Sequence, residues 1–137
     1  MTNFVTHLEC SLTGKIYEAG KVHGLSEAGR PLLVRYDLDR MRVELRQEDI
    51  TNSKANGFWR YAPMLPVTKS ESRISLGEVM TPLMPLKTSA EKLGGKAGNI
   101  IVKDEGRLPT GSFKARGLAL AVSMVHEFGL DHLAIPT

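Results

Sequence analysis

A single lysine at the start of a predicted helix has the clearest chemical potential in this sequence. Lys114 lies in residues 109–117, PTGSFKARG, just before a run with helical apolar spacing. The positive end of a helix dipole disfavours an ammonium ion, so this position favours the neutral amine. A neutral amine can attack a carbonyl carbon and form a Schiff base with a carbonyl compound.

The neighbours of Lys114 suit an anionic ligand. Gly111 allows a tight turn and a close approach of backbone to the ligand. Thr110 and Ser112 offer hydroxyl groups near a helix N-terminus, whose N–H groups bind anions. Phe113 provides an apolar wall, although packing in the core would also explain it. We therefore expect Lys114 to be catalytic and Lys114, Phe113 and Ser112 to bind a cofactor, whereas a lysine without such neighbours would usually be a solvated surface residue.

The elements that must position Lys114 follow from hydrophobic spacing. Residues 99–104 form a short β-branched run, which is typical of a buried strand. Residues 112–128 are predicted to form a helix that Gly129 ends, with a stripe of apolar residues at spacings of three and four: Leu118, Ala121, Val122, Val125 and Phe128. Residues 133–135 predict a second strand. Strand, helix and strand together predict a parallel βαβ unit of an α/β fold.

The rest of the chain divides into two stretches. Residues 1–40 are rich in turns and predict a small β-rich cap with a strand at 31–37, and residues 41–73 form a connecting segment. The aromatic cluster 58–61 (FWRY) is expected to be a packing anchor between the cap and the larger body. Residues 74–137 begin the domain that contains Lys114. Because a two-stranded parallel sheet needs helices on both faces, this domain is expected to be truncated.

The composition is that of an ordinary globular chain. It has 137 residues with a net charge of +3, and no run of five basic residues that would indicate a nucleic-acid-binding arm. No apolar run approaches the roughly 20 residues that span a bilayer, and the first residues do not resemble a signal peptide. Cys10 is the single cysteine, so no internal disulfide forms. We expect a cytoplasmic protein with a small anionic ligand and neither a nucleic-acid nor a membrane partner.

Several blocks occur in an order that is typical of one enzyme family. They are residues 8–11 (LECS), 31–37 (PLLVRYD), 75–83 (SLGEVMTPL), 103–106 (KDEG) and 109–117 (PTGSFKARG). Together they resemble the threonine synthases, which are fold type II pyridoxal-phosphate enzymes of the tryptophan synthase β-like superfamily. The chain departs from the family at Leu108, where asparagine is common, and at Val79, where glycine is usual.

The resemblance implies both a fold and an activity. The fold would be the incomplete front part of a tryptophan synthase β-like fold, preceded by a zinc-ribbon-like cap. Lys114 would hold pyridoxal phosphate covalently and move protons at the substrate carbons. The enzyme would be a carbon–oxygen lyase that converts O-phosphohomoserine and water to threonine and phosphate. The other cofactor contacts would lie beyond Thr137, so the isolated chain is expected to be inactive, and a homodimer is possible for the full-length protein.

Two other interpretations remain open from the sequence. One is another lyase of the same superfamily, such as a threonine dehydratase, a cysteate synthase or a diaminopropionate lyase. The other is a non-catalytic fragment or interaction module. The block at 75–83 and the cap favour the threonine synthases over the other lyases.

The cap is expected to hold no metal. In some relatives it resembles a zinc ribbon with two cysteine pairs, but here other residues stand where the partners of Cys10 would lie: Thr13, Ser26 and Ala28. A structural zinc needs four nitrogen or sulfur ligands. His7, Cys10 and His23 would supply three at most.

Overall fold

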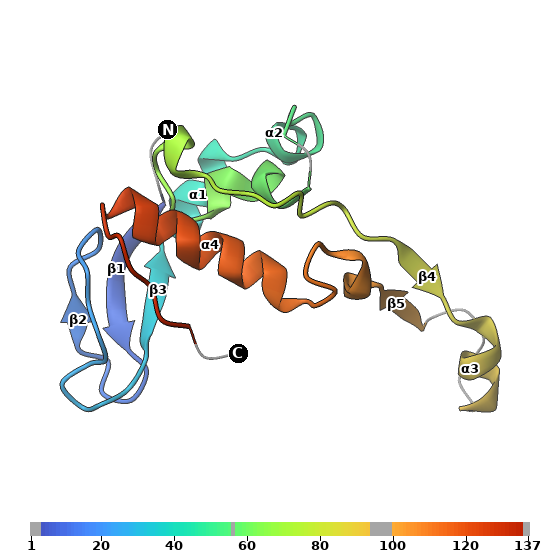
Figure 1. Ribbon diagram of the computed structural model, residues 1–137, viewed down its shortest axis with the longest axis horizontal. Coiled ribbons are helices and arrows are strands. Elements are labelled where there is room, and N and C mark those ends of the chain that lie inside the picture. The colour runs from blue at the N-terminus through green and yellow to red at the C-terminus, as the bar shows by residue number, and fades with distance from the viewer. Residues whose placement is uncertain (1–3, 56, 94–99, 136–137) are drawn as a thin grey trace.

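The N-terminal part of the protein is a small antiparallel sheet. The computed structural model describes residues 4–55, 57–93 and 100–135. Its first sheet has the order β2-β1-β3, with β1 at Val5–Cys10, β2 at Ile16–Tyr17 and β3 at Leu32–Tyr36 (Figure 1). The strand predicted at 31–37 is thus confirmed. The β-rich character expected of the cap is present, while its boundary at residue 40 stays a prediction.

Hydrogen bonds at Cys10 join two turns of the cap, residues 10–14 and residues 26–30. The Cys10 thiol donates to Ser26 Oγ at 3.1 Å and accepts the Thr13 N–H at 3.4 Å. Ser26 Oγ also accepts the Arg30 N–H at 3.1 Å. Cys10 is buried, and within the described residues no three His, Cys, Asp or Glu side chains converge on a point that could hold a metal ion. The absence of zinc in the cap stays a prediction.

Two short helices and a long 3-10 helix follow the sheet. They are α1 (Leu38–Glu44), α2 (Gln47–Thr51) and η1 (Gly57–Met64). Asp37 caps α1, because its carboxylate accepts the Arg40 N–H at 2.9 Å. The first part of the predicted connecting segment is therefore helical.

The aromatic cluster of η1 forms the core. Trp59 packs with Ala62 and Val67, and its indole N–H donates to the Ile74 carbonyl at 3.1 Å. Four half-buried residues surround this centre: Phe58, Leu65, Leu120 and Met124. Leu120 and Met124 belong to the long helix α4 (Lys114–Glu127). The predicted packing of this cluster against the larger body is confirmed, because it packs against α4, while its contact with the cap stays a prediction.

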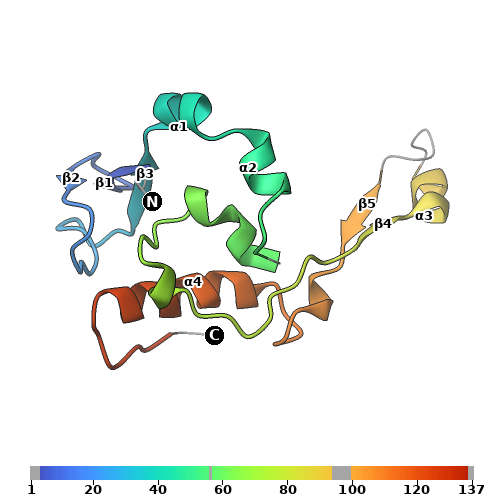
Figure 2. The ribbon, with the colours of Figure 1, turned by 90° about the horizontal axis from the view of Figure 1, so that it is seen from above.

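A two-stranded arm projects from the body of the molecule. Strands β4 (Leu83–Pro85) and β5 (Ile101–Lys103) pair antiparallel, with α3 (Lys87–Lys92) following β4 (Figures 1 and 2). The predicted parallel βαβ unit is therefore wrong for the described residues, and residues 133–135 form no strand. The reason is strand pairing: β5 pairs with β4, while the described chain after α4 turns back alongside that helix without reaching β5 (Figure 1). Asn99, at the start of the predicted strand, lies outside the described residues.

The long helix α4 confirms the helix predicted at 112–128. Gly129 follows it with φ +67°, and the Leu130 N–H donates to the Val125 carbonyl at 3.0 Å, a typical glycine-terminated helix end. Of the helices in residues 4–55, 57–93 and 100–135, none combines the length and the apolar character that crossing a bilayer would need.

The buried face of α4 is not the predicted stripe. The buried positions are small residues four apart: Ala115, Ala119 and Ser123. Small side chains let the neighbouring backbone approach closely, so this face packs inward. Val122, from the predicted stripe, is 37% exposed, and its neighbours on that side are half-buried.

Candidate active site

Lys114 is the first residue of α4, and its side chain is exposed. Its backbone N–H donates to Ser112 Oγ at 3.3 Å, so Ser112 satisfies one backbone donor at the start of the helix. Thr110 Oγ1 donates in turn to the Ser112 carbonyl at 3.4 Å. Gly111 makes the preceding turn with φ +65°, and its N–H donates to the Leu108 carbonyl at 2.7 Å.

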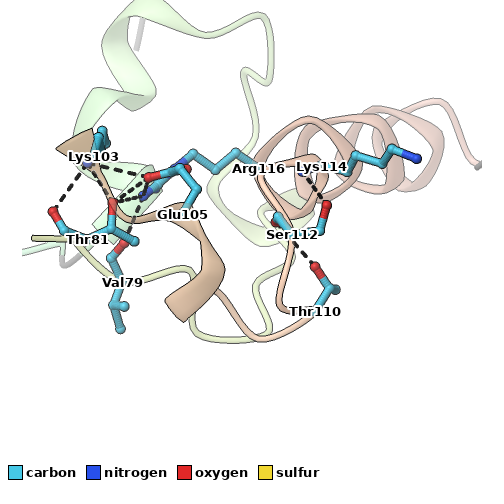
Figure 3. Close-up of polar contacts among 8 residues, drawn as sticks. All are labelled: Val79, Thr81, Lys103, Glu105, Thr110, Ser112, Lys114 and Arg116. Carbon is cyan, nitrogen blue, oxygen red and sulfur yellow. Dashed lines mark hydrogen bonds and ion pairs between the residues drawn. The ribbon is translucent and has the colours of Figure 1, made fainter. Parts of the chain in front are cut away.

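The amine of Lys114 is directed away from the nearby polar side chains (Figure 3). Within the part of the chain that the structure describes, no hydrogen bond or ion pair holds its Nζ atom. Phe113 precedes it and is 71% exposed, which excludes a core-packing role within the described structure. Lys114 and Phe113 are therefore both accessible to a ligand, whereas Ser112 is half-buried and engaged with the backbone.

A polar network behind Lys114 was missed by sequence reasoning. Its centre is the ion pair of Glu105 with Arg116, which joins Arg116 Nε to Glu105 Oε2 at 2.7 Å and Nη2 to Oε1 at 3.1 Å. Both side chains are only about one-fifth exposed. Two parallel bonds between guanidinium and carboxylate fix orientation as well as distance. The block at 103–106 contains Glu105, but nothing in the sequence indicated that Arg116 is its partner.

Thr81 and Lys103 complete the network (Figure 3). Lys103 Nζ donates to Thr81 Oγ1 at 2.7 Å and lies 3.5 Å from Glu105 Oε1. Thr81 Oγ1 donates to Glu105, and Arg116 Nη2 reaches the Val79 carbonyl at 3.0 Å. The bonds from Arg116, and then from Thr81, lower the pKa of Glu105 to about 2. Glu105 is therefore ionised at any working pH.

The loop before Thr81 is fixed by a buried carboxylate. Glu78 is 4% exposed; it accepts a hydrogen bond from Ser75 Oγ and another from the Leu76 N–H at 3.1 Å. Burial would raise the pKa of Glu78, but these hydrogen bonds outweigh it and the pKa is lowered. The Phe58 N–H donates to the Glu78 carbonyl at 3.0 Å, which places this loop on η1.

A shallow cavity lies elsewhere on the molecule. It has a volume of about 580 Å³ and is lined by residues from the start of β1, the α1–α2 region and η1: Phe4, Glu44, Leu45, Arg46, Glu48, Asp49, Asn52 and Pro63. None of the predicted site residues lines it. The candidate site is therefore the open surface at the start of α4.

These features define an α/β chain with an accessible lysine at the start of a helix that buries one face. Its sequence is similar to that of threonine synthases, as the motifs indicated. It is 34% identical to the threonine synthase of Methanocaldococcus jannaschii over 122 residues, which is 89% of this chain and 29% of that protein. It is 46% identical to the threonine synthase of Halalkalibacterium halodurans over 69 residues, which is 50% of this chain and 19% of that protein.

A relative with another name also matches. The chain is 33% identical over 110 residues to a probable D-serine dehydratase of Rhizobium leguminosarum, covering 73% of this chain and 25% of that protein. The chain thus spans under a third of the length of the curated relatives it matches. No model of a known protein family matches it, and no solved structure does.

Proposed function

We propose that the chain is the N-terminal part of a threonine synthase-like lyase that depends on pyridoxal phosphate. The observation behind this proposal is the accessible amine of Lys114 at the start of α4, in a chain similar to threonine synthases over most of its length. On this proposal residues 74–137 begin the catalytic domain, and residues 1–40 form a cap without zinc.

The residues at the start of α4 fit the cofactor. The amine of Lys114 is exposed and held by no described residue, so it is available for covalent attachment to an aldehyde. The exposed ring of Phe113 would lie against the attached group, and Ser112 would keep the first turn of the helix in place. When bound, pyridoxal phosphate stabilises negative charge on the substrate carbon that loses a proton. Lys114 would remove and return protons at the substrate carbons.

The proposed reaction converts O-phosphohomoserine and water to threonine and inorganic phosphate. A carbon–oxygen bond breaks with loss of phosphate, and water supplies the new hydroxyl group. The mild positive charge of the chain, +3, suits this anionic amino-acid substrate. The complete protein would work in the cytoplasm and could form a homodimer, with neither nucleic acid nor membrane as a partner. The described chain alone would have little or no activity.

Reductive labelling tests the proposal directly. The complete protein is incubated with pyridoxal phosphate, reduced with borohydride and mapped by peptide mass spectrometry. We expect the label on Lys114 to exceed that on Lys87 by at least about tenfold. Lys87 is a matched control, because it is also exposed and is the first residue of a helix, α3. Equal labelling of the two lysines would exclude Lys114 as the attachment site.

A second candidate is another lyase of the same superfamily, such as a threonine dehydratase or a cysteate synthase. The similarity to a probable D-serine dehydratase supports this second candidate. Both candidates predict labelling of Lys114, so the substrate must distinguish them. Phosphate release from O-phosphohomoserine supports the first. Formation of a 2-oxo acid from serine or threonine, without phosphate release, supports a dehydratase as the second candidate.

A further inference from the structure

Residues 68–81, which are without helix or strand except for the short 3-10 helix η2 (Ser70–Ser72), run along α4 in the opposite direction (Figure 2). We call this segment the strap. It meets the helix at three points, and the first is the C-terminal end of α4. There the Glu127 carboxylate accepts the N–H groups of Thr68 at 2.9 Å and Lys69 at 3.0 Å, and the Thr68 hydroxyl at 2.6 Å.

The second point lies one turn earlier in the helix. The Ile74 N–H donates to Ser123 Oγ at 2.9 Å, and the same hydroxyl donates to the Ala119 carbonyl at 2.7 Å. Ser123 is fully buried, so these bonds are shielded from water. Ser123 therefore fixes the middle of the strap against the small-residue face of α4.

The third point is Arg116, in the first turn of α4. Its guanidinium reaches the Val79 carbonyl at 3.0 Å and Thr81 Oγ1 at 3.4 Å, while Glu105 holds it from the side of β5. From Arg116 to Glu127 the helix rises about 16 Å. Contacts distributed over that length prevent α4 from sliding along the strap or rotating against it.

The rotation of α4 decides where Lys114 points. Each residue of a helix turns by about 100°, so Lys114 and Arg116 differ by about 200° and project from nearly opposite sides. Holding Arg116 against Glu105 and the strap therefore directs Lys114 away from them. Figure 3 shows this arrangement, with the two side chains leaving the first turn in different directions.

We propose that Arg116 and Glu105 are positioning residues for Lys114: their ion pair, bonded to the strap, sets the rotation of the first turn of α4. The proposal rests on the proposed function, because it assigns a role to the direction of Lys114. Glu105 does not touch the lysine, and it acts through Arg116 and the helix backbone.

The test compares Arg116→Met, Arg116→Lys and Glu105→Gln in the complete protein. The readout is the ratio of borohydride-trapped pyridoxal phosphate on Lys114 to that on Lys87, measured from pH 6 to pH 9. We expect R116M and E105Q each to lower the ratio at least about fivefold, and R116K to restore part of it. The control Glu127→Gln loosens the strap at the far end of the helix and should leave the ratio unchanged within about twofold.

The two variants separate positioning from electrostatics. Loss of the Arg116 cation would favour the ammonium form of Lys114, whereas loss of the Glu105 anion would disfavour it. A purely electrostatic effect therefore changes labelling in opposite directions in R116M and E105Q, and positioning lowers it in both. Opposite changes, or an unchanged ratio in variants that fold, would overturn the proposal.

Amide hydrogen exchange keeps the two proposals distinguishable. If the wild-type protein labels Lys114 no more than Lys87, the proposed function fails. Hydrogen exchange still tests whether the Arg116–Glu105 ion pair holds the first turn of α4. R116M should then speed exchange in the first turn of α4, at 115–118, by about tenfold or more relative to the last turn. Equal exchange in R116M and the wild type at both turns would reject the positioning role independently.

Discussion

At the scale of single residues, Glu105 joins the segment after β5 to Arg116 in the first turn of α4. Its carboxylate accepts bonds from Arg116 and Thr81 and lies near the Lys103 ammonium, which is why its pKa falls to about 2. A carboxylate with a lowered pKa in the folded protein stabilises it above the unfolded pKa, near 4.5, and this stabilisation is lost as the pH falls towards 2.

The Glu105→Gln variant tests this pH dependence of stability. The free energy of unfolding of the wild type should fall between about pH 5 and pH 2, in part because Glu105 becomes protonated. E105Q lacks this titration, so the difference in stability between the two proteins should shrink as the pH falls through that window. Urea denaturation at several pH values measures it. A constant difference from pH 7 to pH 3 would contradict the contribution of Glu105.

Gly57 is a second residue whose identity the packing requires. It has φ +66°, and a Cβ atom added there would lie 1.7 Å from the Glu78 carbonyl oxygen. Gly57→Ala therefore meets both a left-handed backbone and a clash with the loop at 75–78. We expect it to lower the free energy of unfolding by about 3 kcal/mol or more.

Gly20→Ala is the matched control for Gly57→Ala. Gly20 has φ +76°, but an added Cβ would have no neighbour within 4 Å. It isolates the backbone cost, about 1–2 kcal/mol. Equal destabilisation in the two variants, compared by chemical denaturation, would show that the close approach of Gly57 to Glu78 has no energetic weight.

At the scale of elements, the contact between the strap and α4 explains why the buried face of the helix has small residues. Ala115 and Ala119 leave room for neighbouring backbone, and Ser123 adds a hydroxyl that satisfies the Ile74 N–H. A leucine at any of these positions would push the strap away. The apolar stripe on the other side of α4 then remains half-exposed.

Ser123→Ala tests this packing. The variant leaves the Ile74 N–H without its acceptor in a buried position, so we expect a loss of about 1–3 kcal/mol in the free energy of unfolding. Ser89→Ala is the control, because Ser89 is also helical, in α3, but is exposed. It should change stability by less than about 0.5 kcal/mol. Thermal or urea unfolding of both variants gives the comparison, and a loss no larger in S123A than in S89A would contradict the argument.

At the scale of the whole molecule, the described chain has more surface than a compact protein of its mass. Its accessible surface is 9639 Å², against about 7,100 Å² expected for a monomer of 15.1 kDa. Part of the exposed apolar surface lies on the arm and around α4 and the residue before it: Leu83, Ile101, Val102, Phe113 and Val122. A two-stranded sheet such as β4–β5 is marginal in water by itself.

Hydrogen exchange can test whether the arm is covered in the complete protein. We expect amides of β4 and β5 to exchange at least about tenfold more slowly in the complete protein than in the 137-residue chain, because further chain would pair with the arm. Amides of β1 and β3 should exchange equally in both, since that sheet already has its own pairing. Equal exchange of β4 and β5 in the two proteins would contradict the prediction that this surface is covered.

Local sequence patterns were sufficient for some features of this protein. The strand at 31–37, the helix at 112–128 and its end at Gly129 were predicted because each depends on neighbouring residues: a short apolar run that ends in a turn, the spacing of apolar residues, and the freedom of glycine. The resemblance to threonine synthases rested likewise on short continuous blocks.

The sequence by itself determined that a lysine begins a long helix in a chain similar to threonine synthases. Only the tertiary structure decided that β5 pairs antiparallel with β4, that the small-residue face of α4 is buried, and that Glu105 holds Arg116 behind Lys114. These contacts join residues 11 to 49 positions apart in the sequence. Long-range pairing depends on which backbone groups and charges meet in space, and spacing along one segment carries no information about its distant partner.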